Sequence, residues 1–552
     1  MIKPRPWIHV LAAGLLLGLA GCGPLPGPVA EAAAKEGAKQ AAEAQATAPG
    51  DSSGNPGAAL APSSLGGKPA PRTGSAPAVD WTPKLRSIVE QYTRVGIKHV
   101  GGKARSRDFD VSVHVVELKS GQEWGARRAD EAKIPASNMK LVTTAAALVL
   151  LGPGQDFVTP VELLGEVRGA VLQGDLVLRA AGDPIVNPRG DGEVESRLDV
   201  IVEALRARGI TRIQGDVVLD ESSFAEPGPA PGWPPSNQYW QEHCALSAGF
   251  SINGGVLQAL VSPSARGARA TVQVHPTPHG LRSNYGVASS GKRLNVQVGA
   301  TQSAVTVKGE LPAKHAPYLA EFSHPDPVQL FGSVLEARLK RGGIQLDGRL
   351  RRQRNMPAGE SLVALRSSLD EVLIPINTHS RNSVADQLLL ALGNALGRGG
   401  TLKAGAKVTR RALSELGVPS TGFVQADGSG LSRDNRVTAR QLTALIAGVL
   451  GRDPETRRVF QNSLARNGEP GSLESRMLGA GMAGRVFAKT GWITGASSIS
   501  GLCLTQDGQE LVFSILISYP AKLGGLNTHC FKPMQDALIS SLVMDTRSED
   551  RY

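Results

Sequence analysis

Hydrophobic positions in the early part of the chain follow a helical period, then alternate, then return to the helical period. The first stretch predicts a helix over residues 83–92, and the alternation predicts a strand over residues 111–116. After Pro135 apolar residues recur every three or four positions, which predicts a helix over residues 137–150. Residues 81–153 therefore indicate an α/β unit.

The pattern changes between residues 154 and 365, where short β-rich runs dominate and Gly, Pro and Asn separate them. Helical spacing is limited there to residues 199–208 and 328–340. The strands are expected at residues 171–179, 213–219, 256–261, 270–274, 294–298 and 305–311. This region is interpreted as an insertion of one or two domains of mixed, β-rich character.

Helical patterns return over residues 366–552, and they are followed by two strands and a final helix. The helices are expected at residues 383–396, at 407–416 and from about 531, and the strands at 497–505 and 510–517. Because this region resembles the opening unit, we predict one α/β domain formed from residues 81–153 and 366–552 and split by the insertion.

The first 22 residues have the physical character of an export signal. Lys3 and Arg5 precede an apolar run that is too short to span a bilayer, and small residues follow it. The sequence Leu19-Ala20-Gly21-Cys22 is similar to a bacterial lipobox, which implies cleavage before Cys22 and lipidation of its sulfur. The alternative is an ordinary signal peptide with a coincidental cysteine.

Residues 23–80 are rich in Ala, Pro, Gly and Ser and cannot bury enough apolar surface to fold alone. They predict a disordered tether between a lipid anchor and the folded body. We therefore expect an exported protein that is anchored to the membrane through lipid on the periplasmic side, with the outer membrane favoured over the inner one.

Composition and charge restrict the classes of molecule that this protein is expected to bind. Hydrophobic residues make up 41% and charged residues 20% of the chain, as in a folded soluble protein, and the net charge is +11. A basic surface favours polyanions, but no RNA-binding or zinc-finger pattern is present, so an acidic envelope polymer is preferred to nucleic acid. Cysteine and histidine spacing predicts no metal site and no cofactor. Among Cys244, Cys503 and Cys530, the last two could form a disulfide, which the sequence leaves open.

Three short motifs in a fixed order carry the candidate chemistry: Ser137-Asn-Met-Lys140, Ser380-Arg-Asn382 and Lys489-Thr490-Gly491. Residues three apart share one face of a helix, so Lys140 can reach the hydroxyl of Ser137. A serine hydroxyl needs a base to become a nucleophile, and lysine is a base only when its pKa is lowered. Burial and a second cation, here Lys489, both act in that direction.

Each motif alone is weak, because the sequence contains other matches. Residues 289–292 fit the first pattern, 251–253 the second and 119–121 a relaxed third. Only Ser137, Ser380 and Lys489 follow the expected order of the three motifs. They also lie in the expected contexts, with Ser137 at the start of a helix, Ser380 in a turn beside a helix and Lys489 in a strand.

The motif trio is typical of penicillin-binding proteins and class A β-lactamases. Residues 81–545 resemble more closely the D-alanyl-D-alanine carboxypeptidase/endopeptidase family, the class C low-molecular-mass penicillin-binding proteins. The blocks that carry this resemblance span residues 134–148, 377–386 and 427–435. The implied fold is a serine β-lactamase-like transpeptidase domain, with an antiparallel sheet flanked by helices, split by the insertion.

The resemblance implies a role for each residue of the acyl transfer. Ser137 attacks the carbonyl between two D-alanines and forms an acyl-enzyme, and Lys140 accepts its proton. Ser380, oriented by Asn382, relays that proton to the leaving amine, and Lys489 stabilises charge. The implied partners are peptidoglycan stem peptides as substrates and β-lactams as inhibitors.

The same resemblance implies that Thr490, Gly491 and Trp492 bind the substrate. Lys489 and Thr490 would hold the terminal carboxylate, and the N–H groups of Ser137 and Trp492 would form the oxyanion hole. Trp492 replaces a small hydroxyl residue common in the family, and Leu502 replaces a usual tyrosine, which affects the expected shape of the pocket.

Three activities remain open at this point. Carboxypeptidase and endopeptidase activities use the same acyl-enzyme, and so does a transpeptidase. The competing class is a catalytically inactive lipoprotein that binds cell wall. The intact motif residues favour the enzyme.

Overall fold

The computed structural model describes residues 80–187, 193–290 and 293–545, which all belong to one structural unit. The predicted signal peptide, Cys22 and nearly all of the tether lie outside the described residues. No helix within the described ranges is long and apolar enough to cross a membrane.

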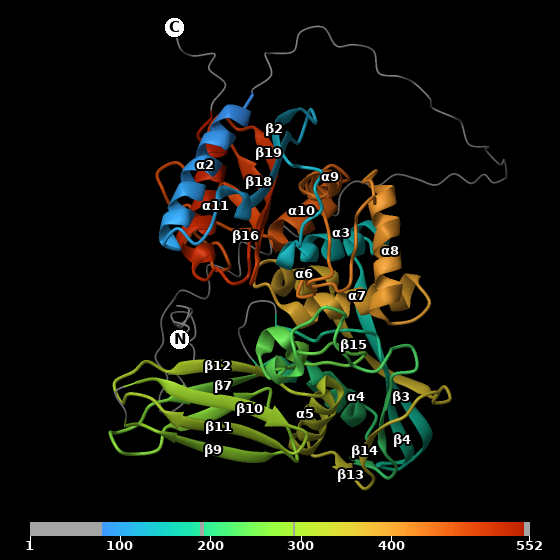
Figure 1. Cartoon of the computed structure of the whole chain (residues 1–552). Helices are drawn as coiled ribbons and strands as arrows, with labels where there is room; N and C mark the ends of the chain where they lie inside the picture. The colour runs from blue at the N-terminus through green and yellow to red at the C-terminus, as the bar shows by residue number, and fades with distance from the viewer. Residues whose placement is uncertain (1–79, 188–192, 291–292, 546–552) are drawn as a thin grey trace, which may run out of the picture. The chain divides into compact units, whose positions relative to one another are not determined.

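A six-stranded antiparallel sheet joins the two ends of the described chain, in the order β16-β17-β18-β19-β1-β2 (Figure 1). The strands are β1 (Asp110–Glu117), β2 (Glu123–Arg127), β16 (Ala465–Arg466), β17 (Val486–Ile493), β18 (Ala496–Leu504) and β19 (Glu510–Ser518). β1 pairs with β19 over its whole length, so the early α/β unit and the end of the chain form one sheet, as predicted.

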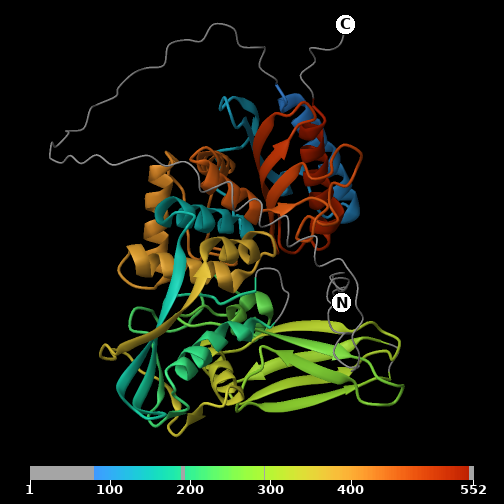
Figure 2. The same ribbon diagram turned by 180° about the vertical axis from the view of Figure 1, so that it is seen from behind.

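Helices cover both faces of this sheet (Figures 1 and 2). α2 (Thr82–His99) and α11 (Lys532–Val543) pack together against one face, and a short π-helical turn, Asn527–Phe531, leads into α11. The other face meets α9 (Ala439–Leu450), which contacts β1, β18 and β19.

The nucleophile predicted from sequence lies at the start of a central, almost fully buried helix. A 3-10 turn, Ala136–Asn138, precedes α3 (Met139–Leu151), so the predicted helix over residues 137–150 begins as a tighter turn. Only the last two residues of α3 are partly exposed, because the helix packs against helices on several sides. Those helices are α6 (Leu369–Asn377), α7 (Asn382–Leu396), α8 (Leu402–Glu415), α9 and α10 (Pro454–Ser463).

The chain between α3 and α6 forms three further sheets. A seven-stranded sheet contains β3 (Asp156–Arg168), β4 (Val171–Arg179), β5 (Arg212–Ile213), β6 (Val217–Asp220), β13 (Gln345–Leu346), β14 (Leu350–Arg352) and β15 (Glu360–Ser368). Two three-stranded sheets contain β7 (Val256–Ser262), β8 (Thr271–His275) and β12 (Tyr318–Ser323), and β9 (Arg282–Ala288), β10 (Asn295–Thr301) and β11 (Ala304–Glu310). The helices here are α4 (Asp199–Ala207) and α5 (Pro327–Arg341).

The chain leaves for this region along β3 and returns along the antiparallel β15, whose Ser368 pairs with Asp156. The predicted insertion, residues 154–365, begins close to the start of β3 and ends close to the end of β15. Its separation as one or two domains stays a prediction. One expected strand, over residues 213–219, is divided into β5 and β6 because Gly215 packs against the backbone of Gly174.

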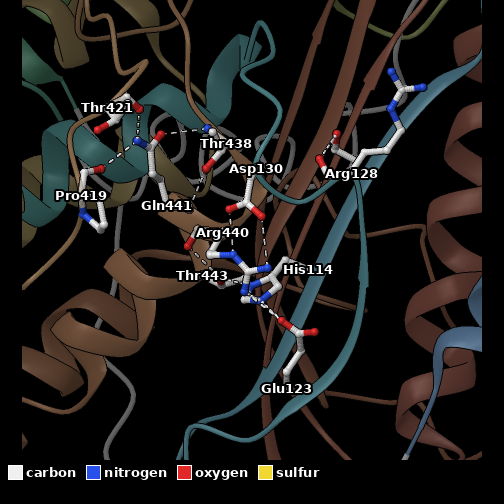
Figure 3. Close-up of polar contacts among 11 residues, drawn as sticks. His114, Glu123, Arg128, Asp130, Pro419, Thr421, Thr438, Arg440, Gln441 and Thr443 are labelled. Carbon is white, nitrogen blue, oxygen red and sulfur yellow. Dashed lines mark hydrogen bonds and ion pairs between the residues drawn. The ribbon is translucent and has the colours of Figure 1, made fainter.

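A polar cluster, buried at His114 and Thr443 and exposed at its other residues, holds the segment that leads to the nucleophile against the sheet (Figure 3). Arg440 of α9 donates to Asp130 at 2.8 Å, to Glu123 of β2 at 2.8 Å and to Nε2 of His114 of β1 at 2.7 Å. His114 Nδ1 lies 2.5 Å from the hydroxyl of Thr443, one turn further along α9. The cluster therefore joins two strands, one helix and the chain that approaches Ser137.

Candidate active site

The three sequence motifs come together at one place in the described structure. Ser137 lies in the 3-10 turn before α3, Ser380 lies between α6 and α7, and Lys489 lies on β17. The residue before the nucleophile, Ala136, has a φ of 46°, and Ser380 has a φ of 63°. Left-handed backbone is unfavourable for residues other than glycine, and such strain is characteristic of functional sites.

Lys140 Nζ is surrounded by three oxygen atoms. It lies 3.1 Å from Ser137 Oγ, 2.6 Å from Asn382 Oδ1 and 2.7 Å from the carbonyl oxygen of Ser429. The amide and carbonyl oxygens can only accept hydrogen bonds, whereas the serine hydroxyl can donate one. A neutral lysine, with two N–H groups and one lone pair, therefore satisfies all three neighbours while accepting the Ser137 proton.

Burial makes that neutral state accessible. Lys140 has no exposed surface, and this desolvation lowers its pKa to about 8, although the Asp386 and Asp427 carboxylates raise it in part. Lys489 is equally buried, and desolvation together with the charge of Lys140 holds its pKa well below the ordinary value. The site thus places Lys489 close enough to Lys140 for the charge of Lys140 to disfavour that of Lys489, while burial is what lowers the pKa of Lys140.

Lys489 Nζ donates to Ser380 Oγ at 2.9 Å and to the carbonyl of Thr490 at 2.8 Å. This contact connects the second and third motifs, as Lys140 connects the first and second. Asn382 is fixed in turn, because its side-chain amide donates to the carbonyl oxygen of His243 at 2.8 Å. The five predicted catalytic residues therefore form two hydrogen-bonded groups, Ser137 with Lys140 and Asn382, and Ser380 with Lys489. The two groups meet through the chain itself, because Ser380 and Asn382 are two positions apart.

The middle residue of the first motif, Asn138, has a positional role that the sequence reading missed. Its Nδ2 donates to the carbonyl oxygen of Lys489 at 2.8 Å, and its Oδ1 accepts from Ser500 of β18 at 2.7 Å. Ser498, also on β18, donates to the carbonyl of Pro135 at 2.6 Å. These bonds hold the nucleophile turn against β17 and β18.

The turn between Asp427 and Asn435, one of the three blocks that carry the family resemblance, also enters the site. Asp427 accepts from the N–H groups of Gly430 and Ser432 at 2.8 and 2.6 Å and from Asn435 Nδ2 at 2.8 Å. The Ser429 carbonyl of this turn is one of the three contacts of Lys140. Sequence gave no sign of that main-chain contact.

A second buried acid supports the same turn. Asp386 of α7 accepts the N–H groups of Gly428 and Ser429 with one carboxylate oxygen, at 2.7 and 2.8 Å. Gly430 then packs directly on the backbone of the nucleophile turn, since a Cβ there would collide with the carbonyl oxygen of Ala136. The acids of α7 and of the turn thus place main-chain atoms beside both Ser137 and Lys140.

The predicted substrate-binding residues end β17. Thr490 is partly buried, and Gly491 is buried against the nucleophile, since a Cβ at this position would lie 2.8 Å from the Ser137 nitrogen. Trp492 is 50% exposed, and its indole donates to the hydroxyl of Tyr519 at 3.1 Å. Leu502 lies in the apolar core that surrounds α3.

The three cysteines within the described ranges, Cys244, Cys503 and Cys530, are buried and free, so Cys503 and Cys530 do not form the disulfide that the sequence left open. Burial raises the pKa of Cys244 to about 11 and that of Cys530 to about 12, which leaves both as thiols at neutral pH.

The model of the D-Ala-D-Ala carboxypeptidase 3 (S13) family matches residues 105–528. The chain belongs to this family. Its members are serine-type hydrolases, and the chain is therefore an enzyme of this class. The matched range contains all three motifs and the whole region between them.

A D-alanyl-D-alanine carboxypeptidase from an Actinomadura species is 33% identical over 425 residues, which are 73% of this chain and 77% of the relative. The fold is similar to that of penicillin binding protein 4 from Haemophilus influenzae, with a TM-score of 0.66, 21% identity and coverage of 81% of this chain and 98% of the other. A second structure of that protein, in complex with a β-lactam, gives a TM-score of 0.63 at 20% identity, with coverage of 82% and 100%. The penicillin-binding-protein fold expected from sequence is thereby confirmed.

Proposed function

We propose that this protein is a D-Ala-D-Ala carboxypeptidase that hydrolyses peptidoglycan stem peptides through an acyl-enzyme on Ser137 and that β-lactams inhibit it. The observation that carries the proposal is the environment of Lys140. Its amine lies 3.1 Å from Ser137 Oγ, and burial lowers its pKa to about 8, which makes the neutral amine that can accept the Ser137 proton accessible. The name of the Actinomadura relative supports the substrate class.

In the acylation step, Ser137 Oγ attacks the carbonyl carbon of the penultimate D-alanine as its proton passes to Lys140 Nζ. The oxygen of that carbonyl becomes an oxyanion, which the N–H groups of Ser137 and Trp492 would receive. The C–N bond then breaks, and the proton returns to the leaving D-alanine amine through Ser380. Ser380 suits this relay because Lys489 donates to its hydroxyl oxygen, which leaves the hydroxyl proton free to be given away.

Deacylation reverses these roles with water in place of the amine. Lys140 takes a proton from the water, which attacks the ester carbonyl. As the C–O bond to Ser137 breaks, Lys140 returns that proton to Ser137 Oγ and the shortened peptide is released. The carboxylate of the terminal D-alanine requires a cationic partner during the first step only. Lys489, beside Thr490 on β17, lies within hydrogen-bond distance of Ser380, and a bound carboxylate would favour its protonated form, which would then hold that charge together with the Thr490 hydroxyl.

The same site also serves an endopeptidase, which cleaves a cross-link between stem peptides by the same chemistry. The alternative function is a catalytically inactive lipoprotein that binds cell wall. It requires a site unable to acylate, whereas here the base Lys140 lies within hydrogen-bond distance of the Ser137 hydroxyl, and Lys489 donates to Ser380.

The proposed place of action is the periplasmic side of the cell envelope, with Cys22 lipidated and the outer membrane favoured. The export-type segment before Cys22 and the Ala- and Pro-rich stretch after it support this proposal.

The test is the intact-protein mass after incubation with benzylpenicillin, for the body from residue 80 onward and its Ser137→Ala variant. Acylation adds one penicillin mass to the parent and none to the variant, and peptide mapping locates it on Ser137. Release of free D-alanine from a pentapeptide, compared with cleavage of a cross-linked dimer, then separates the two hydrolytic activities. A folded parent that takes up no penicillin and releases no D-alanine would favour the inactive binding protein.

A further inference from the structure

The middle residue of the second motif, Arg381, reaches into the inserted region. Its guanidinium donates to Oε1 of Glu321 on β12 at 2.5 Å, across 60 positions of the chain. Glu321 lies within the predicted insertion, residues 154–365, whereas Arg381 and its two neighbours in the motif belong to the predicted α/β domain. This ion pair therefore connects the insertion directly to the second motif.

The carboxylate of Glu321 is also held within its own sheet. Glu321 lies opposite Gln258 of β7 in the antiparallel register, and the side-chain amide of Gln258 donates to the same Oε1 at 2.9 Å. The side chains of Glu321 and Arg381 are 25% and 30% exposed, so solvent and salt screen their attraction only in part. Arg381 thus meets a carboxylate whose position is fixed by the sheet.

The backbone around Arg381 is confined at the same time. The Arg381 N–H donates to the carbonyl oxygen of Pro375 in α6 at 2.9 Å, and Ser380 before it has a φ of 63°. A serine in left-handed backbone persists only where its surroundings hold it there. Because Ser380 and Asn382 flank Arg381 in the chain, a shift of the Arg381 backbone moves both of these motif residues together.

The strand β12 supports the second motif by another route as well. It lies at the edge of its sheet, with β7 on one side, and on the chain segment before it Gln241 forms an antiparallel bridge with Phe322. Two positions after Gln241, the carbonyl oxygen of His243 accepts from the side-chain amide of Asn382 at 2.8 Å. One strand of the insertion therefore holds the motif both at Arg381 and at Asn382.

We propose that Glu321 is a positioning residue of the acyl transfer, supplied by the insertion. It holds Arg381, so that the second motif keeps its contacts with the two buried lysines of the site. Glu321 acts through Arg381 and not on the substrate. The inference rests on the proposed function, because this role requires that the site is acylated.

An ion pair that only stabilises the insertion predicts a different result, because its removal leaves the acylation rate of the folded protein unchanged. The insertion offers such a pair for comparison. Arg338 of α5 donates to Asp199 of α4 at 2.7 Å, and these side chains are 10% and 34% exposed. This pair joins two helices of the insertion and is a matched control for the pair of Glu321 and Arg381.

The experiment measures the rate constant of acylation at saturating benzylpenicillin in the full chain and in its variants. Glu321→Gln removes the charge, Glu321→Asp keeps a carboxylate, and Arg381→Gln removes the other partner. A double variant combines Glu321→Gln with Arg381→Gln, and Asp199→Asn breaks the control pair. Urea unfolding of each variant identifies the temperature at which all of them are folded, and the rates are compared there.

Glu321→Gln and Arg381→Gln should each lower the rate constant at least tenfold, because each leaves the motif without its support. The double variant should be no slower than the slower single variant, since residues that act as one pair do not have additive effects. Glu321→Asp should lose less than threefold. Asp199→Asn should keep the parental rate, whatever its effect on unfolding.

Three results would overturn the positioning role while leaving the proposed function intact. They are a parental rate in Glu321→Gln, an equal loss in Glu321→Asp and Glu321→Gln, and additive losses in the double variant. The role is also overturned if Asp199→Asn slows acylation as much as Glu321→Gln, because the effect then belongs to the insertion in general. A folded parent that penicillin does not acylate refutes the proposed function, and this role with it.

Discussion

Asn138 and Lys489, 351 positions apart, are joined by a hydrogen bond of 2.8 Å from the Asn138 side chain to the Lys489 carbonyl oxygen. Both residues are fully buried. This bond sets the position of β17 relative to the nucleophile turn, and the Ser500 hydroxyl completes it by donating to the other end of the same amide. The spacing between nucleophile and third motif thus depends on a residue without a chemical role.

We predict that Asn138→Ala lowers the rate of penicillin acylation and destabilises the fold. The change removes the donor to the buried Lys489 carbonyl, at about 1–3 kcal/mol, whereas the Ser500 hydroxyl keeps its partner Ser514 at 2.9 Å. Ser500→Ala is the matched control, because it removes the contacts of Ser500 with Asn138 and Ser514 but leaves the bond from Asn138 to Lys489 in place. Denaturant unfolding measures the stability of each variant, and acylation kinetics measure its reaction with penicillin. Equal effects of the two variants would show that the bond to Lys489 has no special role.

The second prediction concerns the pH dependence of acylation. Since desolvation lowers the pKa of Lys140 to about 8, the neutral base is scarce in acid and becomes predominant above pH 8. The acylation rate constant should therefore rise about tenfold per pH unit below pH 8 and level off above it. Stopped-flow measurement with a chromogenic β-lactam gives this profile.

Lys140→Arg provides the control for that profile, because a guanidinium keeps the charge and donates hydrogen bonds but does not become neutral in proteins. We expect its acylation rate to fall by about 10²–10⁴-fold, the usual contribution of a general base. A flat profile in the parent, or a variant of near-parental rate, would exclude Lys140 as the base.

The sequence was sufficient to find the side chains that meet at the candidate site, because the proposed chemistry imposes their spacing. Ser137 and Lys140 must share one helix face, and the structure places them 3.1 Å apart. Strands with a regular pattern of apolar residues could also be predicted from the sequence. β4 follows the predicted run at residues 171–179, and β1 follows the predicted run at residues 111–116. These features depend on local pattern.

The missed features depend on contacts that no local pattern encodes. The Ser429 carbonyl reaches Lys140 from 289 positions away, and any residue type supplies a carbonyl oxygen. Asp386 looks like one more polar position on an amphipathic helix until the fold places it under the Gly428–Ser429 backbone. The strand β3 was not predicted either, because Pro160 and Gly165 interrupt its run, and both residue types weaken a strand pattern.

The third prediction tests the backbone contact of Gly430 with the nucleophile turn. Gly430→Ala should abolish acylation and destabilise the protein, because the added Cβ meets the Ala136 carbonyl and because φ is 84°. Gly417→Ala is the matched control, since Gly417 has a φ of 68° with open space around it. The control carries only the left-handed strain of about 1 kcal/mol. Similar acylation rates in both variants would show that the contact with Ala136 is dispensable.

The last prediction concerns the stability of the fold in acid and rests on His114 (Figure 3). Burial, and then the charge of Arg440, lowers the pKa of His114 below its ordinary value of 6.5, while Glu123 and Asp130 oppose this in part. The unfolded chain therefore binds more protons than the folded one below about pH 6.5. Stability from this residue is fully present above that pH and is lost as the pH falls, by at most about 1.4 kcal/mol per pH unit.

Urea unfolding between pH 7.5 and 5 measures this loss, and His114→Gln should make it smaller. His275 is the control of opposite sign, because its hydrogen bond to Glu195 raises its pKa. The folded state then binds the extra proton, so His275 stabilises the protein in acid, and His275→Gln should steepen the loss slightly, since the side chain is 44% exposed. If both variants shift the profile in the same direction, the arrangement of His114 against Arg440 does not control acid stability.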